Sequence, residues 1–437
     1  MAEGARSVLA SLATGFVEFT VDSGSRYGPD GPLDWPGYGA ARARAAERSG
    51  ETESVVCGTG RVGGVAAVLV AFDFRFLGGS VGTATGDRIE HAFTHARETR
   101  TPLVALLATG GSRMHEGMLS LRQLQRIARA SALLHQAGVP QVSVLRDPTT
   151  GGLWASLGAG ADVVLALPGA QVGFAGARVR PEDGVAYTAE GQFAAGHVDA
   201  LCSAADLAET VSEWLTLLGS GSPGPADVPN ALGTETPAES GWAAVQLTRS
   251  ARRPRAAAYL DDYFDLRRSI SGDRAGGVDP GMLCGIGMRG TRAIAFAAQT
   301  GTATTPAGFR TASRLIRLAD RLGIPVLTLV DTPGAANDAA AERAGVGSAI
   351  AELFGTVAAA RVPVTTLVVG EGGSGGALAL AAPDRTWITP DAYFSVIAPE
   401  LAAAILKRPV SEAPALADRL RLRPADLLEL GVVRGIV

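Results

Sequence analysis

The two halves of this chain repeat one ordered set of features, and this repeat limits the possible folds more than any other property of the sequence. In the first half an apolar strand ends at a glycine pair, residues 110–111, and a helix and a second strand lead to Thr-Gly-Gly at 150–152. In the second half a similar strand ends at Pro-Gly, 333–334, and the same succession leads to Ser-Gly-Gly at 374–376. A shared order at a matched spacing of about 40 residues predicts a duplicated fold.

Strands and helices alternate in both halves, and the strands are continuous apolar runs. This pattern favours an α/β fold with mostly parallel sheets that are covered on both faces. The length of 437 residues suits two domains. A stretch rich in Gly, Ser, Pro and Thr separates the halves, so we expect an N-terminal lobe over 1–218, a linker over 219–245 and a C-terminal lobe over 246–437.

Local signals predict several elements within these lobes. We expect a long amphipathic helix over 119–136 that stops at Gly138, and a second helix over 306–323. Residues 1–50 have a mixed pattern that predicts a partly irregular segment. Residues 331–345 are predicted to form a loop.

The composition argues against several classes of protein. The net charge of −4 gives no sign of the basic face that nucleic-acid binding needs. The three cysteines lie far apart without a CxxC pair, which argues against a disulfide framework or a zinc ribbon. We see no signal peptide, and no apolar run reaches the roughly 18 residues of a membrane span. We therefore expect a soluble, cytoplasmic protein without nucleic-acid or membrane partners.

Glycines at a strand end and at the following helix start have a specific chemical use. Glycine lets a ligand approach the backbone closely, and the first turn of a helix presents free N–H groups. Two such amides that converge from two loops make an oxyanion hole, which stabilises the enolate-like oxygen of a thioester. The alternative is that these glycines only permit tight turns, and their repetition in both halves favours the catalytic interpretation.

No other catalytic motif competes with these glycines. The sequence contains no GxxxxGK[ST] loop, no GxSxG elbow and no HExxH motif. His91, His95 and Glu98 share one face of a predicted helix, but a solvated surface explains them more simply than a metal, and we expect no metal site. His115 and Glu116 either line the active site or cap a loop.

Several long motifs resemble the carboxyltransferase of bacterial acetyl-CoA carboxylase, of the crotonase superfamily. In the first half PLDWPGY, FDFRFLGGSVG, ATGGSRMHEGMLSL, SVLRDPTTGG and PGAQVGFAGARV are similar to its β subunit. In the second half IPVLTLVDTPGA, GEGGSGGALAL, YFSVIAPE and DLLELGVV are similar to its α subunit. The resemblance covers about residues 15–205 and 255–437. It implies two crotonase-like (ββα superhelix) lobes in tandem, fused in the order β then α.

The resemblance also implies the reaction and its residues. A carboxyl group would pass from carboxybiotin to the α carbon of an acyl-CoA of the acetyl or propionyl type, through an enolate held in a backbone oxyanion hole. The resemblance assigns one hole to Gly110, Gly111, Gly151 and Gly152, and the other to Gly334, Gly375, Gly376 and Ala377. It leaves open which hole takes which ligand. It assigns substrate binding to Gly78, Gly79, Ser112, Arg113, Phe174, Ala175, Gly176, Gly372, Gly373 and Ser395.

The implied partners are a biotin carboxyl carrier protein, which bears the biotin cofactor, and a biotin carboxylase. A homodimer is the smallest implied assembly, and the product would be a malonyl-CoA type precursor for fatty acid or polyketide synthesis. The chain departs from the family in lacking the four-cysteine zinc ribbon and any biotinyl Met-Lys signal. The segment QTGTATTPAG is also shorter than its usual counterpart and carries no Lys.

Two other functions remain open at this point. One is a biotin-independent decarboxylase of malonyl thioesters, on CoA or on an acyl carrier protein, which would use the same fold and the same enolate. The other is a non-catalytic scaffold that organises a carboxylase complex. The sequence leaves the acyl chain length, the choice between CoA and a carrier protein, and the oligomer beyond a dimer undetermined.

Overall fold

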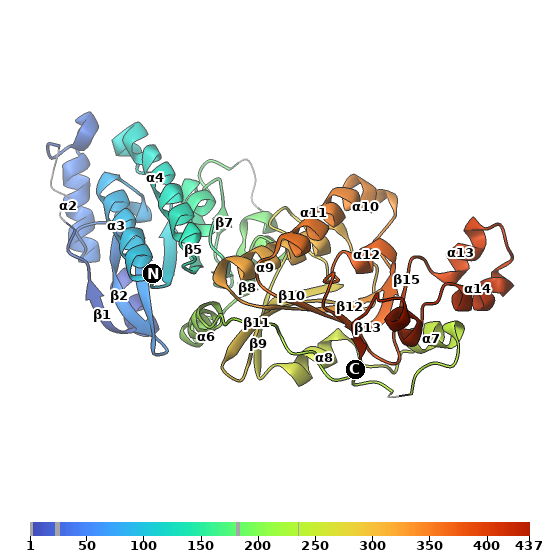
Figure 1. Ribbon diagram of the computed structural model, residues 1–437. Helices are drawn as coiled ribbons and strands as arrows, with labels where there is room; N and C mark the ends of the chain where they lie inside the picture. Colours follow the sequence, from blue (N-terminus) through green and yellow to red (C-terminus); the bar gives the residue numbers. More distant parts are fainter. Residues whose placement is uncertain (1–2, 22–26, 181–183, 235) are drawn as a thin grey trace. The chain divides into compact units, whose positions relative to one another are not determined.

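The computed structural model describes residues 3–21, 27–180, 184–234 and 236–437. The chain divides into two compact units, Met1–Gly219 and Ser220–Val437, which we call unit 1 and unit 2. Figure 1 shows the elements of both units in chain order. Each unit is built around its own eight-stranded sheet, so each is described by itself.

Unit 1 contains eight strands, and most of its helices lie between them in the chain. The strands are β1 (Thr14–Glu18), β2 (Val55–Val62), β3 (Val65–Phe72), β4 (Leu103–Thr109), β5 (Gln141–Thr150), β6 (Val163–Ala166), β7 (Val172–Gly173) and β8 (Ala200–Leu201). The α-helices are α1 (Ala5–Leu12), α2 (Tyr38–Ser49), α3 (Thr83–Thr99), α4 (Gly117–Gln136), α5 (Ala189–Ala194) and α6 (Leu207–Gly219). Short helical turns are η1 (Gly31–Leu33), η2 (Leu77–Gly79), η3 (Met114–Glu116), η4 (Trp154–Gly158) and η5 (Val185–Tyr187).

Unit 2 has a matching set of strands. They are β9 (Leu266–Ile270), β10 (Met282–Arg289), β11 (Arg292–Gln299), β12 (Val326–Thr332), β13 (Val364–Gly373), β14 (Thr386–Ile388), β15 (Tyr393–Ser395) and β16 (Gly435–Ile436). The helices are α7 (Gly241–Thr248), α8 (Ala256–Tyr263), α9 (Pro306–Leu322), α10 (Ala339–Arg343), α11 (Val346–Ala359), α12 (Ser374–Leu378), α13 (Pro399–Ile405), η6 (Val410–Glu412), α14 (Ala413–Arg419) and α15 (Pro424–Glu429).

The two sheets have the same topology, which confirms the duplicated α/β fold. The strand order is β1-β2-β3-β4-β5-β6-β8 in unit 1 and, from the opposite end, β16-β14-β13-β12-β11-β10-β9 in unit 2. In each unit the first three strands pair antiparallel and the later ones pair parallel. A short extra strand, β7 or β15, pairs with the end of the central strand β5 or β13. Two helices pack together over each sheet, α3 with α4 and α9 with α11 (Figure 1).

The same irregularity interrupts the central strand pair of each unit. Between β4 and β5 the register jumps from Leu107–Leu145 to Thr109–Thr149. Between β12 and β13 the register jumps in the same way, by two residues on one strand and four on the other. This bulge turns the strand ends away from regular pairing. As a result, the glycine loops that follow do not continue the regular pairing of the two strands.

The helix predictions are confirmed where the apolar periodicity is strong. The expected helix over 119–136 is α4, and the one over 306–323 is α9, which begins at Pro306 and ends at the left-handed Gly323. Residues 1–50 have the expected mixed character, with α1, β1 and α2 joined by described residues that are mostly outside regular helix or strand. One prediction is wrong: the predicted loop over 331–345 contains the short helix α10, whose N-cap Asp338 accepts a bond from the Ala341 amide.

Candidate active site

The carboxyl ends of β4 and β5 meet at the first pair of glycine loops. Gly111 has φ +100° and Gly151 has φ +78°, which is the left-handed region that favours glycine. A Cβ placed on Gly151 would lie 2.9 Å from the Cα of Gly111. The two loops therefore touch through their backbones, and side chains at these positions would push them apart.

Unit 2 brings its two loops together in the same way. A Cβ placed on Gly373 would lie 2.7 Å from the Gly334 amide nitrogen, and one placed on Gly376 would collide with the Ala335 amide nitrogen. In each unit a threonine at the strand end accepts a bond from the amide of the second loop residue. These bonds join Gly111 to Thr109 over 3.0 Å and Gly334 to Thr332 over 3.1 Å.

The hydrogen bonds of these loops separate the predicted amide donors into two groups. The amides of Gly111 and Gly334 are engaged as described, while that of Gly110 donates to the Gly78 oxygen and that of Gly151 to the Gly173 oxygen. These four N–H groups are therefore bonded within the protein, and the prediction that they point at a ligand needs correction.

The remaining predicted donors lie at the starts of helices. Gly152 opens the helical turn that continues into η4, and Gly375, Gly376 and Ala377 lie in the first turn of α12, whose N-cap has no side-chain bond. First-turn amides have no partner within their own helix. Within the described residues, none of these four N–H groups has an acceptor outside its own helix. They are the amides that remain available for an oxyanion.

A cavity of about 870 Å³ opens beside the first pair of loops in unit 1. Its walls include the predicted residues Gly78, Gly110 and Gly176. They also include Arg48 from α2 and Arg178 from the segment after β7, together with Arg75, Ser80, Asp147, Thr150 and Gln171. Arg75 is already paired with Asp73, whereas among the described residues Arg48 donates only to the Arg75 backbone oxygen. The cavity is therefore large and partly cationic.

A smaller cavity of about 340 Å³ lies beside the start of α12 in unit 2. It is lined by Ser374, Gly375 and the predicted Ser395, and otherwise mostly by apolar side chains, which are Leu378, Phe394, Val396, Leu420, Leu427, Leu430 and Val432. Arg421 is its one lining residue with a full charge among those described. The cavities of the two units thus differ in both size and polarity.

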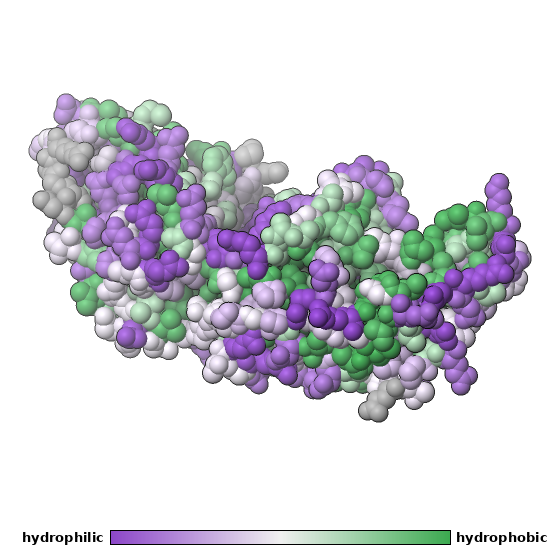
Figure 2. Space-filling model, in the orientation of Figure 1, coloured by the Kyte–Doolittle hydropathy of each residue, from purple (hydrophilic) through white to green (hydrophobic). Residues whose placement is uncertain are grey.

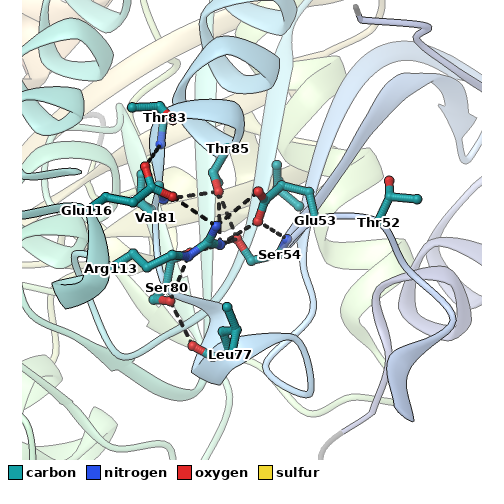
Figure 3. Close-up of polar contacts among 12 residues, drawn as sticks. Thr52, Glu53, Ser54, Leu77, Ser80, Val81, Thr83, Thr85, Arg113 and Glu116 are labelled. Carbon is teal, nitrogen blue, oxygen red and sulfur yellow. Dashed lines mark hydrogen bonds and ion pairs between the residues drawn. The ribbon is translucent and has the colours of Figure 1, made fainter. Parts of the chain in front are cut away.

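Arg113, predicted to bind substrate, points into the interior of unit 1 instead. Its side chain is 1% exposed, and it forms ion pairs with Glu53 and Glu116 (Figure 3). It also donates to the Ser80 backbone oxygen over 2.7 Å. Burial disfavours the charged guanidinium, but the charge and hydrogen bonds of Glu53 outweigh this effect and raise the pKa of Arg113 above its usual value. The partners of Arg113 are therefore protein groups, and Arg113 is not among the residues that line the cavity.

Glu116 has the capping role that was one of its two predicted alternatives. Its carboxylate accepts bonds from the Thr83 amide in the first turn of α3, over 2.7 Å, and from the Tyr38 hydroxyl, over 2.6 Å. Burial is the main cause that raises the pKa of Tyr38, to about 12. The ring of His115 stacks on Tyr38 with 4.9 Å between centroids, so His115 packs against α2 and does not line the cavity.

The other predicted residues have mixed positions. Gly79 packs on β4 so closely that a Cβ would collide with the Ala108 oxygen, and Ser112 forms a bridge with Val81. Phe174 is 72% exposed and Ala175 follows it, outside the residues that line the cavity. Gly372 and Gly373 lie inside β13, where a Cβ on Gly372 would lie 2.6 Å from the Phe394 ring.

Sequence reasoning missed the arginines of the unit 1 cavity. Arg48 lies in the entry segment that was predicted to be partly irregular, and Arg178 was quoted only as part of a longer motif. Neither has a local signal, because a surface arginine on a helix or loop is common. Three arginines from three separated segments become a set only when the fold brings them to one cavity.

The surroundings of His91 and His95 fit a packing role. The rings of His91 and His95 lie 5.2 Å and 4.8 Å from the ring of Phe19. Within the described ranges, no group of three or more His, Cys, Asp or Glu residues is arranged to hold a metal ion. In the same ranges, no helix has both the length and the apolar character needed to cross a bilayer.

Two family profiles match the chain, one in each unit. "Carboxyl transferase domain" matches residues 16–199, and "Acetyl co-enzyme A carboxylase carboxyltransferase-like" matches residues 237–437. The order of the two matches is that of the two glycine-loop sites.

Curated relatives match over nearly the whole chain. The acetyl-coenzyme A carboxylase carboxyl transferase subunits beta/alpha of Saccharopolyspora erythraea are 40% identical, over 96% of this chain and 79% of the relative. Those of Salinispora arenicola are 41% identical over 94% and 77%. A probable biotin-dependent acyl-coenzyme A carboxylase beta3 subunit of Mycobacterium bovis is 34% identical over 91% and 82%.

Solved structures share the fold at lower sequence identity. Transcarboxylase 12S, a hexamer solved with methylmalonyl-coenzyme A and methylmalonic acid bound, superposes with a TM-score of 0.80 at 22% identity, over 100% of this chain and 86% of that one. A single-chain long-chain acyl-CoA carboxylase gives 0.77 at 18%, over 99% and 45%. These likenesses confirm two tandem crotonase-like lobes. By its sequence relatives, the chain belongs to the biotin-dependent acyl-CoA carboxylase family, as a carboxyltransferase in which β-like and α-like halves are fused.

Proposed function

We propose that this chain moves a carboxyl group from carboxybiotin to the α carbon of an acyl-CoA, through an enolate held by backbone N–H groups. The observation that carries the proposal is the pair of glycine-loop sites, each of which borders a cavity and is followed by a helix start whose first amides have no acceptor outside their own helix among the described residues. In a site shielded from water, such amides stabilise the negative charge that develops on a thioester oxygen.

Unit 1 is the better candidate for the acyl-CoA site. Coenzyme A is long and carries several phosphate charges, and the cavity of about 870 Å³ has room for part of it. Arg48 and Arg178 line this cavity, and neither forms an ion pair with another described residue. Guanidinium groups suit phosphate because they donate two parallel hydrogen bonds. The Gly152 amide, two residues after the cavity-lining Thr150, would be the candidate donor to the thioester oxygen.

Unit 2 is the better candidate for biotin. The cavity of about 340 Å³ is mainly apolar, which suits a fused ring with a hydrocarbon arm, and the first-turn amides of α12 suit the ring's single carbonyl oxygen. Biotin on a carrier protein would supply the carboxyl group and a base for the α proton. The chain's own residues would bind the two ligands, polarise their carbonyl oxygens and exclude water.

The proposed partners follow from the assignment of acyl-CoA to unit 1 and biotin to unit 2. A biotin carboxyl carrier protein and a biotin carboxylase would act with the chain, in the cytoplasm. A second copy of the chain would cover the apolar surface over α13 that Figure 2 shows, where Leu401 is 55% exposed and Ile405 is 70% exposed. Light scattering on the purified chain tests this part, because a monomer at all concentrations would contradict a homodimer.

The decisive experiment compares turnover of malonyl-CoA with and without biotin. We expect loss of the carboxyl group from malonyl-CoA only when free biotin or a biotinylated carrier is present, because the enolate needs a carboxyl acceptor. We also expect carboxylation of acetyl-CoA or propionyl-CoA with a carboxylated carrier as donor. Rapid release of CO2 without biotin would instead identify a decarboxylase and overturn the proposal.

A further inference from the structure

We propose that Arg113 is a positioning residue of the unit 1 site, where its buried guanidinium holds two loops that form the wall of the cavity. The proposal rests on the proposed function, because it assumes that this cavity receives the acyl-CoA. The two loops are the turn at 78–80, which follows β3, and the loop at 110–112, which follows β4.

The backbones of the two loops are already joined along one edge. The Gly110 amide donates to the Gly78 oxygen over 2.9 Å, and the Val81 amide donates to the Gly111 oxygen over 2.9 Å. The Arg113 amide then donates back to the Val81 oxygen over 2.9 Å. These three backbone hydrogen bonds fix the spacing of the two loops. They do not involve the backbone oxygen of Ser80.

The Arg113 side chain supplies that support. Its guanidinium reaches the Ser80 backbone oxygen at 2.7 Å and the Ser80 hydroxyl at 3.3 Å, while both carboxylate oxygens of Glu53 accept from it (Figure 3). Ser80 lines the cavity, together with Gly78 and Gly110 from the same two loops. Arg113 would thus act on a ligand through Ser80, because Arg113 bonds to Ser80 and Ser80 lines the cavity.

The cluster also joins the cavity wall to α2. The Tyr38 hydroxyl lies 3.2 Å from the guanidinium and donates to Glu116, and α2 carries Arg48 at its far end. One buried cation therefore connects the segment before β2, both cavity loops and the helix that presents a candidate phosphate ligand. The planar guanidinium of arginine has five N–H donors and can bond to all these partners at once, which the single ammonium group of lysine cannot do.

The test must separate positioning from stability, because breaking a buried ion pair is costly in itself. Removing Arg113 alone leaves Glu53 buried without its partner, which typically destabilises by about 3–5 kcal/mol. The double variant Arg113→Met with Glu53→Met removes both charges, and such replacements are often close to neutral in stability. Glu116 loses its ion pair with Arg113 in that variant but keeps its bonds from Tyr38 and Thr83.

We expect the double variant to unfold near the wild-type temperature but to have a KM for acyl-CoA raised at least about tenfold, because small misplacements of binding groups are costly. The KM for biotin is expected to be unchanged. Hydrogen exchange should accelerate in peptides covering 77–82 and 109–115 and stay unchanged in unit 2. The matched control is Arg126→Met with Glu90→Met, which removes the ion pairs of Arg126 with Glu90 and Asp87 between α4 and α3 without touching either loop. We expect it to leave the KM and these exchange rates unchanged.

Wild-type KM and unchanged exchange in the double variant would overturn the proposal. Faster exchange spread evenly over unit 1 would also overturn it, because it would indicate a general structural role. If the wild-type chain shows no biotin-dependent turnover of acyl-CoA, the proposed function fails. Hydrogen exchange alone then decides whether Arg113 positions the loops.

Discussion

Unit 1 and unit 2 have the same backbone plan and different side chains at the equivalent places. Each unit has a threonine at the end of its strand β4 or β12 and a bulge in the pair β4–β5 or β12–β13. Each also has glycines where its two loops touch. Where unit 1 has the buried Arg113, unit 2 has Ala336 two residues after its loop glycine. Where unit 2 has the buried Asp331, paired with Arg253 and Arg255, unit 1 has Ala108.

This difference teaches how a duplicated fold can serve two ligands. The amides at the loops depend on backbone geometry, which both units retain, whereas the walls depend on side chains, which have diverged. Unit 1 has a large, partly cationic cavity and unit 2 a small, apolar one. Each unit also has a buried ion pair near its loops, Arg113 with Glu53 in unit 1 and Arg253 with Asp331 in unit 2, but at different positions.

The largest expected effect comes from separating the touching loops in either unit. Gly151→Ala introduces a Cβ at 2.9 Å from the Gly111 Cα with φ +78°, and Gly376→Ala introduces one against the Ala335 amide. We expect each change to lower kcat for carboxyl transfer by about 10²–10³, as for the loss of an oxyanion donor. Circular dichroism controls for folding. Full activity in both variants would favour the scaffold alternative.

A second pair of variants tests whether the two cavities take different ligands. Gly110→Ala and Gly375→Ala each add one methyl group to a cavity wall, and the nearest atom to the new Cβ is 3.4 Å away at Gly110 and absent within 4 Å at Gly375. We expect Gly110→Ala to raise only the KM for acyl-CoA and Gly375→Ala only the KM for biotin, each by about tenfold. Crossed effects would reverse the assignment of ligands.

Acid stability should distinguish the buried charge of unit 1. Burial works against the Glu53 carboxylate, but the charge and hydrogen bonds of Arg113 outweigh it, so the pKa of Glu53 lies below its usual value. A lowered pKa adds stability that is fully present above the unfolded-state value of about 4.3 and is lost as the pH falls through the folded-state value.

Urea unfolding of the wild type and of Glu53→Gln tests this linkage. The variant is expected to be less stable at pH 7 because it loses the ion pair. The gap should narrow as the pH falls below about 4.3, because the unfolded chain then binds the proton before the folded carboxylate does. A gap that stays constant over this range would show that Glu53 does not contribute through its charge.

The smallest expected effect concerns the outer helices of the two units. The helix α11 of unit 2 contains Gly355, whereas α4 of unit 1 has no glycine after its first residue. A Cβ at Gly355 meets nothing within 4 Å, and its φ is not in the left-handed region. Gly355→Ala is therefore expected to raise the unfolding free energy by about 0.5–1 kcal/mol without changing either KM. A loss of stability would indicate that α11 has a hidden contact.

The sequence by itself determined the duplication, the mostly parallel sheets and the glycine sites. These features are local, because apolar runs report strand burial directly and glycine is needed wherever loops touch or φ is positive. Strong periodicity also placed α4 and α9 correctly. The short helix α10 escaped prediction because its five residues carry too little periodic signal.

Only the tertiary structure decided which amides remain free and what the side chains of the sites do. The Gly110 amide donates to the Gly78 oxygen, and the Gly151 amide donates to the Gly173 oxygen. These partners are distant in sequence and are brought close by the strand register. In the same way Arg113 belongs to a prominent motif yet points inward, because Glu53 lies 60 residues away but beside it in space. Hydrogen-bond partners across strand ends depend on register and packing, and no local pattern encodes them.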